Sequence, residues 1–116
     1  MCKFIVIFLT IFLIGCPQKQ VGRTYYDDGK IKSEAIVING MLQGKATMYY
    51  PNGLKMSSAN YSNGILDGYA YSYYENGKKK AEAKYTNGLL DGLSYEWNPD
   101  GSEKGKANFI RGKLIN

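Results

Sequence analysis

The chain has 116 residues, 15 of them basic and 10 acidic, with no histidine and two cysteines. Such a length allows one small domain at most. Without histidine the usual general base is missing, and both cysteines stand among the first sixteen residues, outside the repeated part of the chain. We therefore expect no enzymatic activity, no catalytic residues and no cofactor.

The first sixteen residues differ in composition from the rest. A basic start is followed by an apolar run from Phe4 to Ile14, which has the length of a signal peptide and is too short for a comfortable membrane-spanning helix. The run ends in Leu13-Ile14-Gly15-Cys16, which resembles a bacterial lipobox. An uncleaved anchor that ends in Gly-Cys is the alternative.

The lipobox resemblance implies that residues 1–15 are a lipoprotein signal peptide and that Cys16 is the lipidation site, carrying acyl chains such as palmitate. Two or more chains give stable anchoring to a membrane. The expected location is thus the cell envelope. Pro17 in place of aspartate favours the outer membrane if the organism is Gram-negative. Residues 16–24 read as a lipidated tether, because Pro17 to Arg23 has no period and little apolar content.

The remainder, residues 25–116, repeats itself every 24 residues. Two series of glycines keep this spacing, namely Gly29, Gly53, Gly77 and Gly101, and Gly40, Gly64, Gly88 and Gly112. A fixed short period indicates a repeat array, with repeats 25–48, 49–72, 73–96 and 97–116. Alternating side chains between frequent turn dipeptides predict two strands per repeat. The predicted fold is all-β, a single-layer antiparallel meander of about eight strands.

The first turn of each repeat sets the predicted register. Pro51-Asn52-Gly53 favours a three-residue loop, a type I turn with glycine in the left-handed conformation, over a two-residue hairpin turn. Tyr50 then lies opposite Leu54, Tyr49 opposite Lys55, and Thr47 opposite Ser57.

This register predicts an aromatic face and a solvent-exposed face of charged residues, here called the charged face. The aromatic face gathers large rings against small residues, and its candidate partner-binding residues are Tyr49, Tyr61, Tyr71, Tyr73, Tyr85, Tyr95 and Trp97. Ser57, Ala59, Ala81 and Ala83 belong to the same predicted face. The residues of the charged face include Lys78, Lys80, Glu82 and Lys84.

The second turn of each repeat reads Asn-Gly-x-Leu-x-Gly in three copies, for example from Asn63 to Gly68. We expect its leucines to fold back over the sheet edge on the aromatic face. Asp67 and Asp91 are interpreted as turn residues; a ring of carboxylates around a metal is the alternative, and we predict no metal site.

The lysine run Lys78-Lys79-Lys80 could contact nucleic acid or an acidic membrane. Lysine on exposed strands is also a common guard against unwanted edge pairing. For an exported protein we favour a solvated face and predict no nucleic-acid partner.

The phrase Tyr-Tyr-x-Asn-Gly, a strand, and then Tyr-x-Asn-Gly-x-Leu-x-Gly resembles the MORN-variant repeat of YwqK-family antitoxin-like proteins. The resemblance covers residues 25–116 and implies membrane and protein contacts. The predicted function is that of a non-enzymatic, lipid-anchored envelope protein that binds a protein partner through its aromatic face. The alternatives are an antitoxin or immunity protein and a structural envelope protein that assembles through its terminal strands.

Overall fold

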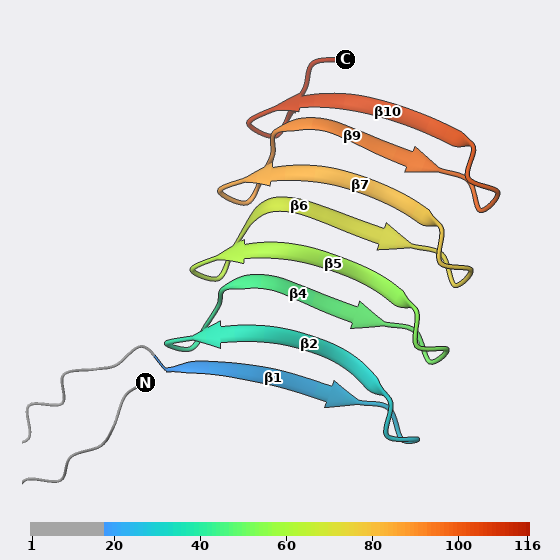
Figure 1. Ribbon diagram of the computed structural model, residues 1–116. Coiled ribbons are helices and arrows are strands. Elements are labelled where there is room, and N and C mark those ends of the chain that lie inside the picture. The colour runs from blue at the N-terminus through green and yellow to red at the C-terminus, as the bar shows by residue number, and fades with distance from the viewer. Residues whose placement is uncertain (1–17) are drawn as a thin grey trace, which may run out of the picture.

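The computed structural model describes residues 18–116, so the predicted signal peptide and Cys16 lie outside the described residues. Eight long strands follow one another in chain order across one sheet (Figure 1). They are β1 (Lys19–Tyr25), β2 (Ile31–Ile38), β4 (Gly44–Tyr49), β5 (Lys55–Ser62), β6 (Ile65–Tyr73), β7 (Lys79–Thr86), β9 (Gly92–Trp97) and β10 (Glu103–Ile110). Three two-residue strands, β3 (Met41–Leu42), β8 (Leu89–Leu90) and β11 (Lys113–Leu114), pair with β2, β7 and β10.

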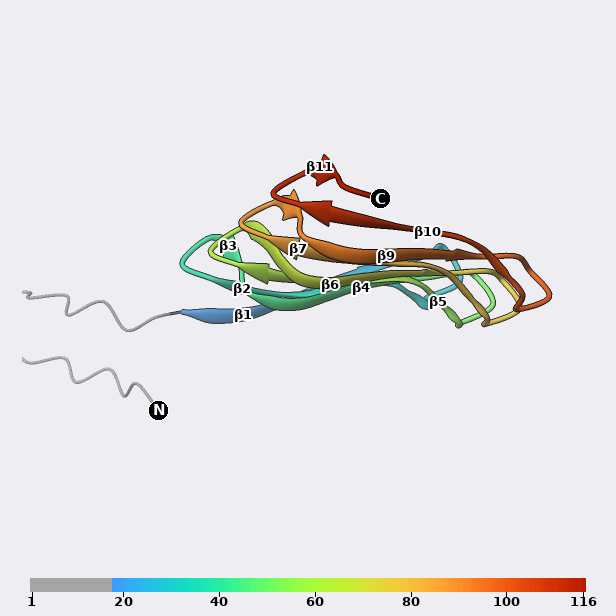
Figure 2. The same ribbon diagram turned by 90° about the horizontal axis from the view of Figure 1, so that it is seen from above.

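The sheet is antiparallel throughout and forms a single layer, which Figure 2 shows from its end. Its radius of gyration is 19.0 Å, whereas a compact domain of this size has about 13 Å. Among the described residues no hydrophobic side chain is buried; the two buried side chains are those of Thr47 and Ser58. The predicted single-layer meander of about eight strands is confirmed.

The sheet begins earlier than the sequence predicted. Strand β1 occupies Lys19–Tyr25 and pairs along its whole length with β2, so most of the expected tether is part of the sheet. The strand was not predicted, because charged and small residues such as Lys19, Gly22 and Arg23 give it no apolar alternation. All seven β1 residues are exposed, so backbone pairing places them in the sheet without an apolar pattern.

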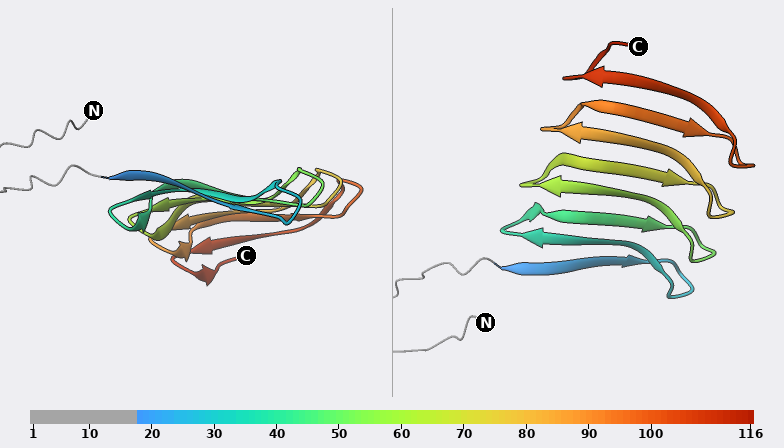
Figure 3. Two further views of the ribbon diagram at one scale, coloured as in Figure 1. Left: turned by 90° about the horizontal axis from the view of Figure 1, so that it is seen from below. Right: turned by 45° about the horizontal axis from the view of Figure 1, so that its top comes forward.

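The turns at the two ends of the strands have different geometries (Figure 3). In the first turn the N–H of Gly53 donates to the Tyr50 carbonyl at 2.9 Å and the N–H of Tyr50 to the Leu54 carbonyl at 2.8 Å. Gly53 has a φ of 85°, as a type I turn closed by a left-handed glycine requires. The predicted three-residue loop is confirmed.

The second turns are two-residue turns in which both residues have positive φ, 49° at Asn63 and 79° at Gly64, the signature of type I′. Their leucines do not fold back. Leu42 pairs with Val37 and Leu90 with Tyr85 in regular register. Asn-Gly fixes a tight hairpin here, so the leucines continue the ladder.

A bulge after the first turn overturns part of the predicted register. Tyr49 does face Lys55, but Met48 faces Ser57 and Thr47 faces Ser58. One extra residue on the second strand shifts every later pair by one. The same shift recurs in the next repeat, where Tyr73 faces Lys79 and Ser72 faces Ala81.

The shift redistributes the side chains between the faces, because successive residues of a strand point to opposite sides. One side, here called the Tyr71 face, carries residues that pair across β6, β7, β9 and β10: Tyr69, Tyr71, Glu82, Lys84, Tyr95 and Lys106. The opposite side, the Ala83 face, carries Ser57, Ala59, Tyr61, Ala70, Ala81, Ala83, Tyr85, Ala107 and Phe109. The predicted division into an aromatic face and a charged face was therefore wrong.

Candidate binding site

The Tyr71 face holds a compact group of rings around one lysine. We call it the Lys79 cluster; it consists of Tyr71 from β6, Lys79 and Glu82 from β7, and Tyr95 and Trp97 from β9. Tyr71 pairs with Glu82, and Glu82 with Tyr95, directly across the strands. Three neighbouring strands thus place these side chains on one side of the sheet.

Lys79 lies between the rings of two strands. Its Nζ is 5.0 Å from the ring centroid of Tyr71 and 5.7 Å from that of Trp97, within the range of cation–π attraction. The same Nζ donates to Glu82 Oε2 at 2.7 Å. This hydrogen bond raises the pKa of Lys79 above its ordinary value, so the cation persists at every physiological pH.

Two stacked pairs of rings flank this lysine. Tyr95 and Trp97 stack with centroids 5.6 Å apart, and Tyr69 and Tyr71 with centroids 6.0 Å apart; the interplanar angle is 18° in both pairs. The members of each pair are two residues apart on one strand, and β7 separates the pairs. The result is a ring platform with one cation and one carboxylate at its centre.

The platform is open to solvent, because no second layer lies over the sheet in residues 18–116 (Figure 2). The side chain of Lys79 is 46% exposed and that of Glu82 is 22% exposed. Flat aromatic area combined with adaptable polar groups is the composition that protein interfaces favour.

The structure unites five of the seven predicted partner-binding residues. Tyr71, Tyr95 and Trp97 belong to the Lys79 cluster, and strand alternation places Tyr49 and Tyr73 on the same face. Tyr61 and Tyr85 lie on the Ala83 face, since they pair with Gly44 and Gly68 beyond the bulge. That these residues bind a partner stays a prediction.

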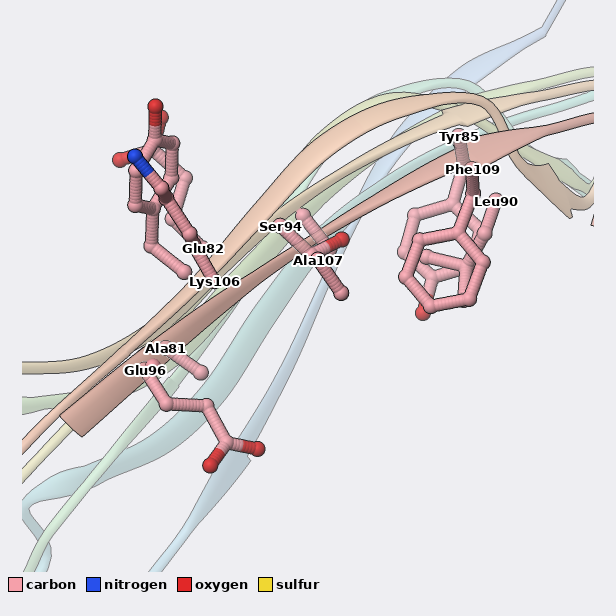
Figure 4. A pocket seen from close by; sticks show the side chains of 12 residues that line it. Ala81, Glu82, Tyr85, Leu90, Ser94, Glu96, Lys106, Ala107 and Phe109 are labelled. Atoms are coloured by element: carbon pink, nitrogen blue, oxygen red, sulfur yellow. The ribbon is translucent and has the colours of Figure 1, made fainter. Parts of the chain in front are cut away.

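Tyr85 lines a hollow on the Ala83 face instead. Figure 4 shows Tyr85, Leu90 and Phe109 together on one side of the sheet, with Glu82 and Lys106 on the other. The hollow measures ≈ 400 Å³, and small side chains such as Ala83 and Ala107 form its floor. It is a shallow apolar surface with few polar groups to orient a ligand.

Sequence reasoning assigned Glu82 to the charged face and did not single out Lys79 as a binding residue. The run Lys78-Lys79-Lys80 contains the signal, because a bulge needs one residue more than strict alternation allows. Lys79 precedes the bulge and faces Tyr73 in either register, whereas Glu82 joins the Tyr71 face because Lys80 is the extra residue.

In residues 18–116 no three His, Cys, Asp or Glu side chains gather closely enough to hold a metal ion. One shifted carboxyl is that of Asp100, whose pKa is lowered because Ser102 donates hydrogen bonds to it from its hydroxyl at 2.6 Å and its N–H at 2.8 Å. Asp100 belongs to the turn after β9, where these bonds order the loop.

Over the same part of the chain the structure contains no helix of the length and apolarity that crossing a bilayer requires. The model of one protein family, described as the MORN repeat variant, matches residues 21–39, 42–64 and 66–87, together more than half of the chain. The comparison with curated proteins finds no significant match.

Proposed function

Because the chain belongs to the family of proteins built from the variant MORN repeat, we propose that it is a non-enzymatic binding module that contacts a protein partner through the Tyr71 face. The Lys79 cluster is the observation that supports this proposal. Its stacked rings and central ion pair present a rigid surface, and rigid aromatic groups cost little conformational entropy on binding.

The ion pair at the centre adds selectivity to the aromatic area. Lys79 and Glu82 already satisfy each other at 2.7 Å, so a partner that covers them does not leave an unpaired charge behind. Truncating either residue would leave the charge of the other unpaired when the partner buries it. A partner surface with aromatic or apolar groups around a polar centre fits this arrangement.

Affinity capture tests the proposal. The tagged mature protein is incubated with an envelope extract of its own organism, and the captured proteins are identified and quantified. Replacing Tyr71 and Trp97 with serine should reduce capture of the partner by about 30-fold or more, since a single central aromatic anchor contributes about 2 kcal/mol or more.

The matched control replaces two rings of the Ala83 face, Tyr61 and Tyr85, with serine. Capture should survive this change, and circular dichroism should show a sheet in both variants. Unchanged capture with the Tyr71/Trp97 variant, or loss with the control alone, would contradict the assignment to the Tyr71 face.

We propose further that lipid on Cys16 holds the domain at a membrane of the cell envelope, the outer membrane if the organism is Gram-negative. The support is the lipobox-like Leu13-Ile14-Gly15-Cys16. Mass analysis of the N-terminal peptide should find an acylated Cys16, and Cys16→Ser should abolish this acylation and leave residues 1–15 attached. An unmodified Cys16 in membrane-bound protein would overturn this part.

An antitoxin or immunity function is the narrower alternative that the YwqK-family resemblance supports. It predicts a neighbouring toxin gene and growth arrest when this gene alone is deleted; a harmless deletion with no such neighbour rejects it. A structural role, by edge-to-edge assembly of terminal strands, predicts oligomers of the mature domain whose size increases with concentration.

A further inference from the structure

The turns at the two ends of the strands differ in their side chains. The edge formed by the type I′ turns, here called the type I′ edge, consists of residues 38–41, 62–65, 86–89 and 110–113 (left side of Figure 1). Large apolar side chains are exposed on and beside it: Met41 at 45%, Ile65 at 51%, Leu89 at 51%, Ile110 at 52% and Leu114 at 64%.

These apolar side chains form a continuous ridge from one repeat to the next. A Cβ built on Gly64 would lie 3.8 Å from Met41, one on Gly88 would lie 3.5 Å from Ile65, and one on Gly112 would lie 3.6 Å from Leu89. Each side chain therefore lies over the turn of the following repeat. A ridge of this kind is larger than the scattered single hydrophobic residues of an ordinary surface.

The charges of the two edges differ as well. The four segments of the type I′ edge contain no carboxylate, with Asp67 and Asp91 two residues beyond the second and third, and the last one carries Arg111 and Lys113. The opposite edge, at the type I turns, is rich in charges of both signs: Asp27, Asp28, Lys30, Glu75, Lys78, Asp100 and Glu103. An apolar ridge that ends in basic residues suits an anionic lipid surface, which attracts lysine and arginine.

The chain enters the sheet at the type I′ edge. Lys19, the first residue of β1, pairs with Ile38, and the carbonyl of Gln18 accepts from the N–H of Asn39 at 3.4 Å. Cys16 precedes Gln18 by two residues in the sequence, a span of at most about 7 Å. An acyl chain on Cys16 would thus bring this edge to the lipid headgroups.

We infer that the type I′ edge rests on the membrane, with Met41, Ile65 and Leu89 at the boundary between headgroups and acyl chains. The sheet then stands on its edge, and both the Tyr71 face and the Ala83 face remain open to a partner. The inference rests on the proposed lipidation of Cys16. It adds which part of the sheet faces the membrane, and lipidation alone does not specify that.

Depth measurement on the full lipidated chain tests the orientation. In a Cys2→Ser background, a single cysteine is introduced at Thr86 on the type I′ edge or at Glu75 on the opposite edge and labelled with a fluorophore. The protein is placed in vesicles of phosphatidylethanolamine and phosphatidylglycerol whose acyl chains carry bromine. The label at position 86 should be quenched and the label at 75 should not; equal quenching would overturn the inference.

Matched substitutions test whether binding to lipid depends on the ridge or on exposed apolar side chains in general. Ile65→Ser with Leu89→Ser removes two ridge side chains, whereas Leu54→Ser removes an apolar side chain of similar exposure from the opposite edge, 44% against 51% for Leu89. In a lipid-free chain of residues 17–116 the ridge pair should lower partitioning to the same vesicles by about tenfold, and Leu54→Ser should leave it unchanged.

The same two experiments distinguish this inference from the proposed function. An unacylated Cys16 contradicts the proposed anchoring, while the lipid-free chain of residues 17–116 still reports whether the ridge binds lipid. Equal losses from the ridge pair and from Leu54→Ser, or no partitioning at all, would overturn the membrane-facing edge and leave partner capture by the Tyr71 face untouched.

Discussion

At the scale of single residues, the second tyrosine of each Tyr-Tyr pair links its repeat to the next. The hydroxyls of Tyr26, Tyr50 and Tyr74 donate to the main-chain carbonyls of Tyr49, Tyr73 and Trp97 at 2.6, 2.7 and 2.8 Å. Each bond is part-buried and joins residues 23 positions apart. Side-chain bonds of this kind supplement strand pairing in a sheet without an enclosed core.

Removing one of these hydroxyls should therefore weaken the fold. We expect Tyr74→Phe to lower the free energy of unfolding by about 1 kcal/mol, because the Trp97 carbonyl loses its donor and is part-buried. Urea denaturation followed by circular dichroism measures the change. Tyr69→Phe is the control, since that ring is 42% exposed; an equal loss in both variants would contradict the role of the Tyr74 bond.

At the scale of the element, each strand pair contains two backbone irregularities that recur every 24 residues. A left-handed glycine closes the first turn, and a bulge follows on the second strand, as at Lys79 to Ala81. A further irregularity follows the type I′ turn, where Gly44, Gly68 and Gly92 have φ of 82°, 115° and 123°. The strands bend at these points, which shapes the sheet that Figure 3 shows.

The glycine after the type I′ turn offers a test of this element. At Gly68 the φ is 115° and a Cβ would lie 3.1 Å from the Cβ of Asn60, so Gly68→Ala should destabilise the protein by about 1–3 kcal/mol. Gly105→Ala meets nothing within 4 Å and should change stability by about 0.5 kcal/mol or less. Thermal denaturation of both variants checks the pair, and a neutral Gly68→Ala would refute the strain.

At the scale of the whole molecule, the sheet is a one-dimensional stack in which each strand pairs only with its neighbours. Strands β5 and β6 have long partners on both sides, whereas β1 pairs with β2 alone. Local opening should thus proceed from the ends toward the middle.

Hydrogen exchange followed residue by residue would show this order. We expect the amides of β5 and β6 to exchange most slowly and those of β1 and β11 to exchange first, because each terminal strand loses one interface rather than two when it opens. Tyr74→Phe should accelerate exchange most at the β6, β7 and β9 strands near the lost bond. Uniform protection along the chain would show a single cooperative unit instead.

Much of the architecture was predictable from the sequence. The glycine spacing gave the repeat, the alternation gave an all-β meander, and Pro51-Asn52-Gly53 gave the three-residue loop, because each depends on neighbouring residues alone. The candidate site was predictable only in part. Tyr49, Tyr71, Tyr73, Tyr95 and Trp97 share one face by simple alternation along their own strands, but Glu82 joins them only through the bulge at Lys80.

The sequence by itself determined the period, the strand content and the type of the first turn, since glycine, proline and asparagine constrain φ and ψ locally. Only the tertiary structure decided which residues of neighbouring strands share a face, because one bulged residue in each repeat exchanges the two faces of every following pair. That exchange placed Glu82 on the same face as Tyr71 and Lys79 and moved Tyr61 and Tyr85 to the opposite side. Backbone pairing likewise drew Lys19–Tyr25 into the sheet, where no apolar pattern marks a strand.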